Sequence, residues 1–123
     1  MANKIQAQQT YPRLTVYNEE NFQGRSAIYR GNLGIANLDS RLGGIESLRF
    51  FSTSSNATLV LFTRTNFRGR FLVFRGNRSI ADLDDIIGGE DAESLISTNQ
   101  RLTLAQIRAI RDSGNLPDGY RRL

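Results

Sequence analysis

Residues 17–44 read YNEENFQGRSAIYRGNLGIANLDSRLGG, and residues 62–89 read FTRTNFRGRFLVFRGNRSIADLDDIIGG. The two stretches align without a gap at an offset of about 45 residues, within the period range of structural repeats. The residues that they share are Asn21/Asn66, Phe22/Phe67, Gly24/Gly69, Arg25/Arg70, Arg30/Arg75, Gly31/Gly76, Asn32/Asn77, Ile35/Ile80, Ala36/Ala81, Leu38/Leu83, Asp39/Asp84, Gly43/Gly88 and Gly44/Gly89. Most of these are glycines, aromatics and turn formers rather than catalytic types, so the repeat preserves a shape.

Each copy contains runs of residues typical of short β-strands. Residues 14–17 (LTVY) and 59–62 (LVLF) open the copies, and residues 27–29 and 72–74 each precede an Arg-Gly-Asn stop. These runs are aliphatic, β-branched and aromatic, as strands in half-buried sheets are. Turn signals then recur about every 8 to 12 residues, which is typical of an all-β sandwich or barrel.

The segment between the first two runs predicts a tightly folded hairpin. Residues 18–21 (NEEN) are too polar for the interior of a strand. Gly24 follows them, and glycine can adopt φ > 0 without steric cost. We therefore expect a hairpin folded back on itself and covered by Tyr17 and Phe22.

Both copies resemble the Greek-key motif of the βγ-crystallin family. The motif has an aromatic residue, four residues, a second aromatic, one residue and a glycine, followed about two dozen residues later by a serine that opens a strand. The matching residues are Tyr17, Phe22, Gly24 and Ser47 in the first copy and Phe62, Phe67, Gly69 and Ser94 in the second. The resemblance covers residues 13–97.

The resemblance implies an all-β fold, a Greek-key β-sandwich of two packed four-stranded sheets. It also implies that Ser47 and Ser94 tie down the hairpins as structural rather than catalytic residues. The expected organisation is an N-terminal arm (1–12), a βγ-crystallin domain (13–97) with motif one at 13–53 and motif two at 57–97, and a C-terminal helical extension (98–123). A domain of this size can bury enough apolar surface to fold without disulfides.

Composition removes several classes of function. The chain has no Cys and no His, so thiol catalysis, disulfides, the usual general base and most zinc sites are absent. We expect no catalytic residues and no enzyme. No apolar run approaches the 18 residues or so of a membrane span, and the first residues do not resemble a signal peptide, which predicts an intracellular protein without a membrane partner.

The net charge of +4 raises the question of nucleic acid. Basic balance is the electrostatic signature of phosphate binding. Here the cations are nearly all arginines spread through both repeats, and no DNA- or RNA-binding motif accompanies them. Nucleic acid is therefore not the favoured partner, and a polyanion or nucleic-acid binder that uses the basic tail is the third hypothesis for function.

Calcium is the second hypothesis. Many microbial βγ-crystallins bind it through two Asn or Asp residues, two variable residues, Ser or Thr, and then Ser. Residues 42–47 (LGGIES) lack both leading ligands, whereas residues 89–94 (GEDAES) supply Glu90, Asp91 and Glu93. Carboxylate oxygens are the hard ligands that calcium prefers. The resemblance thus implies a calcium site at the second motif, and the alternative is an acidic surface loop that balances neighbouring arginines.

The C-terminal extension predicts one helix over residues 104–113. Thr103 and Gln106 have the spacing of a capping box, and Gly114 provides a stop. An apolar stripe on this helix must pack either on its own domain or on a neighbouring molecule. The residues proposed for self-association are Leu104, Ile107, Ile110, Arg108 and Arg111.

The leading hypothesis for function is a non-enzymatic structural protein that is stable and self-associating, forming homo-oligomers or higher assemblies. A role in stress, dormancy or spores follows only by analogy with members of the resembling family.

Overall fold

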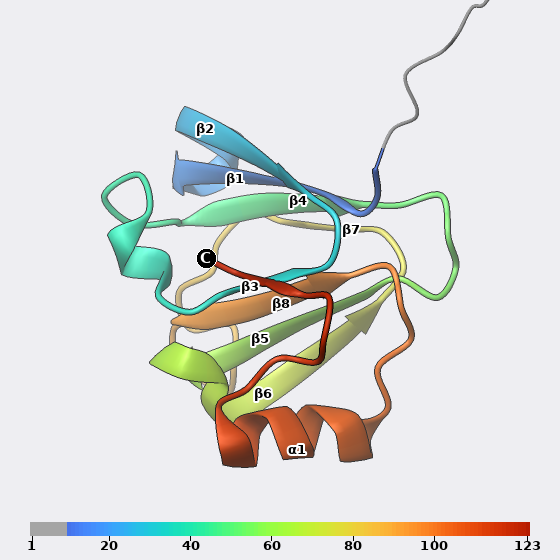
Figure 1. The fold of residues 1–123 in the computed structure, drawn as a ribbon. Helices are drawn as coiled ribbons and strands as arrows, with labels where there is room; N and C mark the ends of the chain where they lie inside the picture. Colours follow the sequence, from blue (N-terminus) through green and yellow to red (C-terminus); the bar gives the residue numbers. More distant parts are fainter. Residues whose placement is uncertain (1–9) are drawn as a thin grey trace, which may run out of the picture.

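The computed structural model describes residues 10–123 (Figure 1). The arm predicted at residues 1–12 therefore lies mostly outside the described residues. In chain order the described strands are β1 (Arg13–Glu19), β2 (Gln23–Arg30), β3 (Leu33–Ile35), β4 (Ser47–Phe51), β5 (Thr58–Arg64), β6 (Arg68–Arg75), β7 (Arg78–Ile80), β8 (Ser94–Thr98) and β9 (Arg121–Arg122). Three 3₁₀ turns, η1 (Glu20–Phe22), η2 (Leu38–Ser40) and η3 (Thr65–Phe67), and one helix, α1 (Leu104–Ser113), complete this part of the chain.

The strands form two packed sheets, and each motif lends one strand to the other motif's sheet. The first sheet has the order β2-β1-β4-β7, and the second has the order β6-β5-β8-β3-β9. Strand β3 of the first motif pairs with β8, and β7 of the second motif pairs with β4. This exchange gives the predicted Greek-key β-sandwich (Figure 1).

The predicted pair of four-stranded sheets needs one correction, because the second sheet has a fifth strand. Strand β9, from the C-terminal tail, runs parallel to β3 and closes that edge. The Arg121 backbone N–H donates to the Asn32 carbonyl at 3.0 Å, and the Leu123 N–H donates to the Gly34 carbonyl at 2.8 Å. The family motif does not include this tail, so the resemblance could not predict its pairing.

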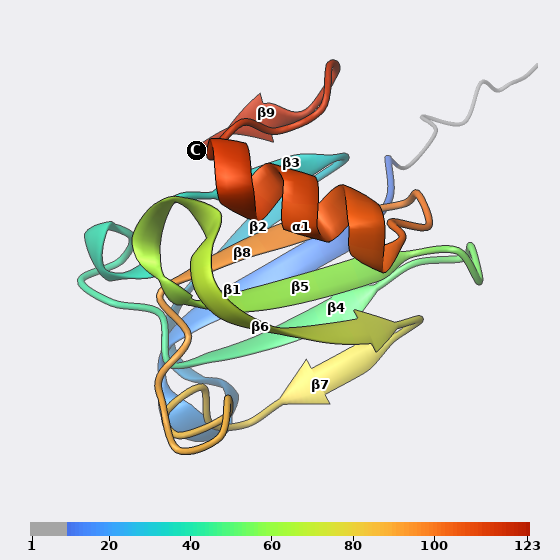
Figure 2. The same cartoon turned by 90° about the horizontal axis from the view of Figure 1, so that it is seen from below.

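Two hydrophobic cores hold the layers together. The larger one lies between the sheets, where alternate residues of each strand point inward. Its largest fully buried side chains include Leu14, Leu33, Ile35, Leu38, Leu48, Leu59, Leu61, Leu83 and Leu95. The second core lies between the outer face of the second sheet and α1, which crosses that face in Figure 2. It contains Val60, Phe62, Phe67, Ile96, Leu102, Ile107 and Ile110.

Helix α1 has the predicted limits and the predicted cap. The Thr103 and Gln106 side chains each accept a hydrogen bond from the other's backbone N–H, at 3.1 Å and 2.8 Å. Gly114 ends the helix with φ of 75°. Within residues 10–123, no helix is long and apolar enough to cross a membrane.

The apolar stripe of α1 packs on its own domain. Ile107 is 0% exposed and Ile110 is 4% exposed, whereas Leu104 is 48% exposed. The prediction that Ile107 and Ile110 contact another molecule is therefore wrong, because the chain's own second sheet already covers them. Of the five residues proposed for self-association, Leu104, Arg108 and Arg111 are the three that remain at least partly exposed.

Candidate functional site

A buried serine hydroxyl closes each folded hairpin. The Ser47 hydroxyl accepts a hydrogen bond from the Phe22 N–H at 3.0 Å and donates one to the Glu19 carbonyl at 2.6 Å. Ser94 makes the same pair of bonds with Phe67 and Arg64, at 3.0 Å and 2.6 Å. Both serines are 0% exposed. Each uses its single donor on a main-chain carbonyl, which supports the predicted structural role.

The aromatic residues and glycines of the motif shape the same corner. Tyr17 and Phe22 make an edge-to-face contact with ring centroids 5.8 Å apart, and Phe62 and Phe67 repeat it at 6.0 Å. Gly24 has φ of 79°, and a Cβ there would lie 2.1 Å from the Asn18 Oδ1 atom. Glycine is therefore the residue that fits, as the sequence predicted.

Next to each serine, a glutamate meets an aspartate from the other motif. The Glu46 carbonyl accepts a hydrogen bond from the Leu83 N–H at 2.9 Å, and this contact brings Glu46 beside Asp84. In the symmetric position, the Glu93 carbonyl accepts from the Leu38 N–H at 2.9 Å, beside Asp39. The fold thus builds two related pairs of carboxyl groups across the boundary between the motifs.

The first of these pairs gains a third carboxyl group. Oxygen atoms of Glu20, Glu46 and Asp84 lie within 4.8 Å of one another. They come from η1, the residue before β4 and the loop after β7. The residue that corresponds to Glu20 in the second copy is Thr65, so the pair of Glu93 and Asp39 lacks this third oxygen donor.

Burial, and after it the neighbouring negative charges, raises the pKa of these carboxyl groups. Burial, followed by the charge and hydrogen bond of Asp84, raises the pKa of Glu46 above its ordinary value of 4.5. Burial and then the charges of Asp91 and Asp82 raise the pKa of Asp84. Burial and then Asp39 raise the pKa of Glu93. A bound cation would stabilise the charged form of such a carboxyl group, whose ionisation costs free energy in this environment.

The arrangement of strands and corners is shared with solved crystallin domains. A domain described in connection with the evolution of the eye-lens βγ-crystallin fold matches with a TM-score of 0.53 and 22% identity, covering 77% of this chain and 93% of that one. Spherulin 3a from Physarum polycephalum matches with a TM-score of 0.54 and 20% identity, covering 77% of this chain and 90% of that one. The chain has the βγ-crystallin fold.

A third solved relative of this fold is the fifth crystallin domain of the non-lens protein Absent in melanoma 1. It matches with a TM-score of 0.50 and 19% identity, covering 76% of this chain and 92% of that domain. No family model matches the sequence, and no curated protein matches it either. The likeness is therefore one of fold, supported in the sequence by the two tandem motifs.

Within this βγ-crystallin fold, the structure does not gather the predicted ligands Glu90, Asp91 and Glu93. Glu90 forms an ion pair with Arg70. An oxygen of Asp91 accepts a hydrogen bond from the Asp85 N–H at 3.2 Å. In the described residues, the group of three carboxylates that could hold a metal ion is at the first motif's serine instead.

The sequence analysis aligned each copy alone and so did not find the cluster at the first motif, and the second-motif site stays a prediction. The third donor, Asp84, comes from the other motif, and only pairing of the motifs brings it next to Glu46. A usable signal was present in the sequence. Asp39 and Asp84 are shared by both copies, and neither lies in a strand or in the buried core of the repeat.

Proposed function

We propose that this domain is a structural, non-enzymatic protein whose repeated motifs maintain a durable fold. The observation that carries the proposal is that Ser47 and Ser94 are both fully buried. Each hydroxyl both accepts a hydrogen bond from, and donates one to, the main chain of a folded hairpin. The tail adds a helix and a strand to the same compact unit. A role in stress, dormancy or spores belongs to this proposal, since durability is what such a role requires.

The test is to remove one serine hydroxyl from the full-length chain. In Ser94→Ala the Phe67 N–H loses its acceptor in a buried corner, which costs about 1–3 kcal/mol. Ser55→Ala, at an exposed position, is the matched control and should change little. Urea denaturation measures both. Equal stability of the two variants, together with loss of a chemical turnover in Ser94→Ala alone, would indicate a catalytic serine and overturn the proposal.

A second candidate function is calcium binding, favoured by the cluster of Glu20, Glu46 and Asp84. Three carboxylates within 4.8 Å are a donor set that fits a hard divalent cation. They lie on three segments from both motifs, so a bound ion would link the motifs and stabilise the fold by mass action. This candidate is an alternative to the second-motif location that the sequence predicted.

Thermal unfolding with and without calcium tests the candidate site. We expect calcium to raise the melting temperature of the unmodified chain and to have a much smaller effect on Glu46→Gln. Glu90→Gln is the matched control, because it removes a carboxylate that pairs with Arg70 outside the cluster. If Glu90→Gln abolishes the calcium effect and Glu46→Gln retains it, the ion binds where the sequence placed it and not at the cluster.

A further inference from the structure

The outer faces of the two sheets differ, although the motifs that build them are repeats. The outer face of the second sheet is apolar and lies under α1 (Figure 2). No described element crosses the outer face of the first sheet (Figure 1). In the described chain, no helix covers that face as α1 covers the other.

Corresponding cross-strand pairs show how the faces diverged. In the second sheet, Val60 of β5 pairs with Ile96 of β8, and both are 0% exposed beneath the helix. In the first sheet, the equivalent pair is Thr15 of β1 and Arg49 of β4. Arg49 is exposed. An apolar contact in one sheet is thus replaced by a guanidinium in the other.

Three arginines share this open face. Leu14 and Val16 of β1 point into the core, so the alternation of the strand turns Arg13 outward. Arg13 lies opposite Arg30 of β2, and Arg49 of β4 lies opposite Thr15, two residues further along β1. The first sheet therefore presents three guanidiniums across three neighbouring strands.

These three arginines have no carboxylate partner in the described structure. The ion pairs found in residues 10–123 join Arg70 to Glu90 and Arg111 to Asp112. Residues 1–9 contain no Asp or Glu. In the paired region of β1, from Arg13 to Tyr17, none of the outward positions of β1, β2 and β4 holds an acid. At these strand positions the face thus carries arginines and no acidic side chain.

Aromatic rings lie among the cations. The guanidinium carbon of Arg49 is 3.7 Å from the centroid of the Phe22 ring, and that of Arg13 is 4.9 Å from the centroid of the Phe51 ring. Tyr11 makes an edge contact with Phe51 at 5.9 Å. Planar guanidiniums and rings are the groups on which unpaired bases stack.

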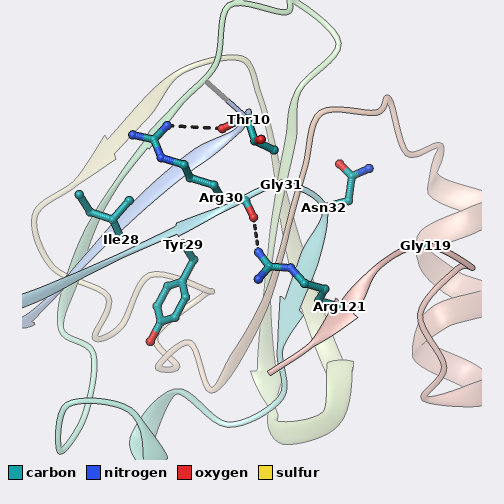
Figure 3. Close-up of a pocket in the computed structure, with 8 residues that line it drawn as sticks. All are labelled: Thr10, Ile28, Tyr29, Arg30, Gly31, Asn32, Gly119 and Arg121. Carbon is teal, nitrogen blue, oxygen red and sulfur yellow. Dashed lines mark hydrogen bonds between the residues drawn. The ribbon is translucent and has the colours of Figure 1, made fainter. Parts of the chain in front are cut away.

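A hollow adjoins the patch at the end of β2. It has a volume of about 700 Å³ and is lined by residues that include Thr10, Ile28, Arg30 and Arg121. Figure 3 shows Arg30 directed to the Thr10 carbonyl and Arg121 directed to the Arg30 carbonyl. Ile28, which is 56% exposed, supplies an apolar wall. The hollow extends the patch with a fourth arginine and room for a flat group.

We infer that the outer face of the first sheet binds single-stranded nucleic acid. Arg13, Arg30 and Arg49 contact phosphates, and the rings of Phe22 and Phe51 stack on bases. A single strand fits better than a duplex, because rings on a flat sheet reach bases only where these are unpaired. Apart from Arg121 at the hollow, this surface lies outside the C-terminal tail, to which the sequence assigned polyanion binding.

Fluorescence anisotropy of the full-length protein tests the inference with a labelled single-stranded oligonucleotide of about 12 nucleotides. Arg13→Ala/Arg49→Ala should weaken binding by about tenfold or more and reduce the salt slope by about 1.4, because two phosphate contacts are lost. The matched control is Arg101→Ala/Arg108→Ala. It removes the same charge from exposed positions of the tail and should leave affinity within about twofold.

Two further variants separate a specific loss of oligonucleotide binding from misfolding and from a general loss of positive charge. Arg13→Lys/Arg49→Lys keeps the charge but loses the planar groups, so it should retain heparin binding and weaken oligonucleotide binding. Phe51→Leu should likewise weaken only the oligonucleotide. Absence of oligonucleotide binding at low salt would overturn the inference, as would equal losses in the face and tail variants. Binding of heparin, polyglutamate or duplex as tight as that of the single strand would also overturn it.

Discussion

At Asn21 and Phe22 the backbone has φ of 58° and 61°, values that non-glycine residues rarely adopt. Asn66 and Phe67 repeat the conformation with φ of 60° and 63°. Such residues cost about 1–3 kcal/mol each and persist where their surroundings hold them. Here the holding contact is the serine hydroxyl, which takes the N–H of the second strained residue in each copy. The motif's serine and its aromatic corner are therefore one energetic unit.

The motif glycine should be far less replaceable than a glycine with the same backbone angle in open space. Gly69 has φ of 85°, and a Cβ there would lie 2.2 Å from the Thr63 Oγ1 atom, which accepts the Arg70 N–H. Gly76 has φ of 76° with no atom within 4 Å of a Cβ. Gly76→Ala should cost about 1–2 kcal/mol for the left-handed conformation alone. Gly69→Ala should cost clearly more, and similar urea midpoints for the two variants would contradict this.

The carboxyl cluster should make stability depend on pH in a defined direction. The pKa of Glu46 is raised in the folded chain, first by burial and then by Asp84. A raised pKa means that the folded state binds more protons. The contribution of Glu46 is therefore complete below its unfolded value of about 4.5 and is lost as pH rises through the folded value. We expect the stability of the unmodified chain relative to Glu46→Gln to fall over that window. Ser55→Ala, at an exposed position without a titratable group, should show no such trend, and a flat difference for Glu46→Gln would contradict the expectation.

At the scale of elements, helix α1 depends on its packing. Ten residues are marginal for an isolated helix in water, even with a capping box. Ile107 and Ile110 supply the missing stability by filling the second core beside Phe67 and Ile96. Gly34 leaves room for the tail, since a Cβ there would lie 2.9 Å from the Leu116 Cδ1 atom. The helix and tail are thus integral to the second sheet.

Self-association through α1 stays a prediction, now narrowed to Leu104 and Arg108. Arg111 stacks on Phe71 of its own sheet, with its guanidinium carbon 5.5 Å from the ring centroid. Leu104→Asp should lower the mass measured by light scattering while leaving the urea midpoint nearly unchanged, because the side chain is 48% exposed. Ile107→Asp should instead destabilise the monomer by about 3–5 kcal/mol through a buried unpaired charge. A monomeric unmodified chain at high concentration and low salt would refute self-association.

At the scale of the whole molecule, the sequence predicted the features that recur in each motif and missed two contacts between distant segments of the chain. The tandem motifs predicted Ser47, Ser94 and the glycine corners, because each depends on residues local to one copy. The Greek-key pairing of strands between the copies was implied by the family resemblance. The contact of Glu46 with Asp84 and the strand β9 depend on segments far apart in the chain. Neither is marked by a local pattern. The limits of α1 were predicted correctly because helix caps are local signals. The surface that Ile107 covers was not predicted, because it belongs to strands far from α1 in the sequence.

The exchange of strands makes each motif dependent on the other for folding. Strand β3 lies in the first half of the chain, yet it pairs with β8 and β9 from the second half. Strand β7 makes the reverse contribution by pairing with β4. The core between the sheets also draws Leu14 and Leu48 from one half and Leu59 and Leu95 from the other. A half chain therefore lacks both a strand partner and one wall of its core.

Separating the halves between residues 53 and 54 tests this dependence. The fragment of residues 1–53 should be unfolded alone, because β3 has no partner and Leu14 and Leu48 have no opposing sheet. Mixed with residues 54–123 it should recover the β circular-dichroism spectrum and a cooperative thermal transition, since the cut removes only chain connectivity at an exposed loop. The mixture is also the control for damage caused by the cut itself. A cooperative transition for residues 1–53 alone would show that one motif carries a complete core, and the paired architecture would then be a docking of two independent units rather than one fold.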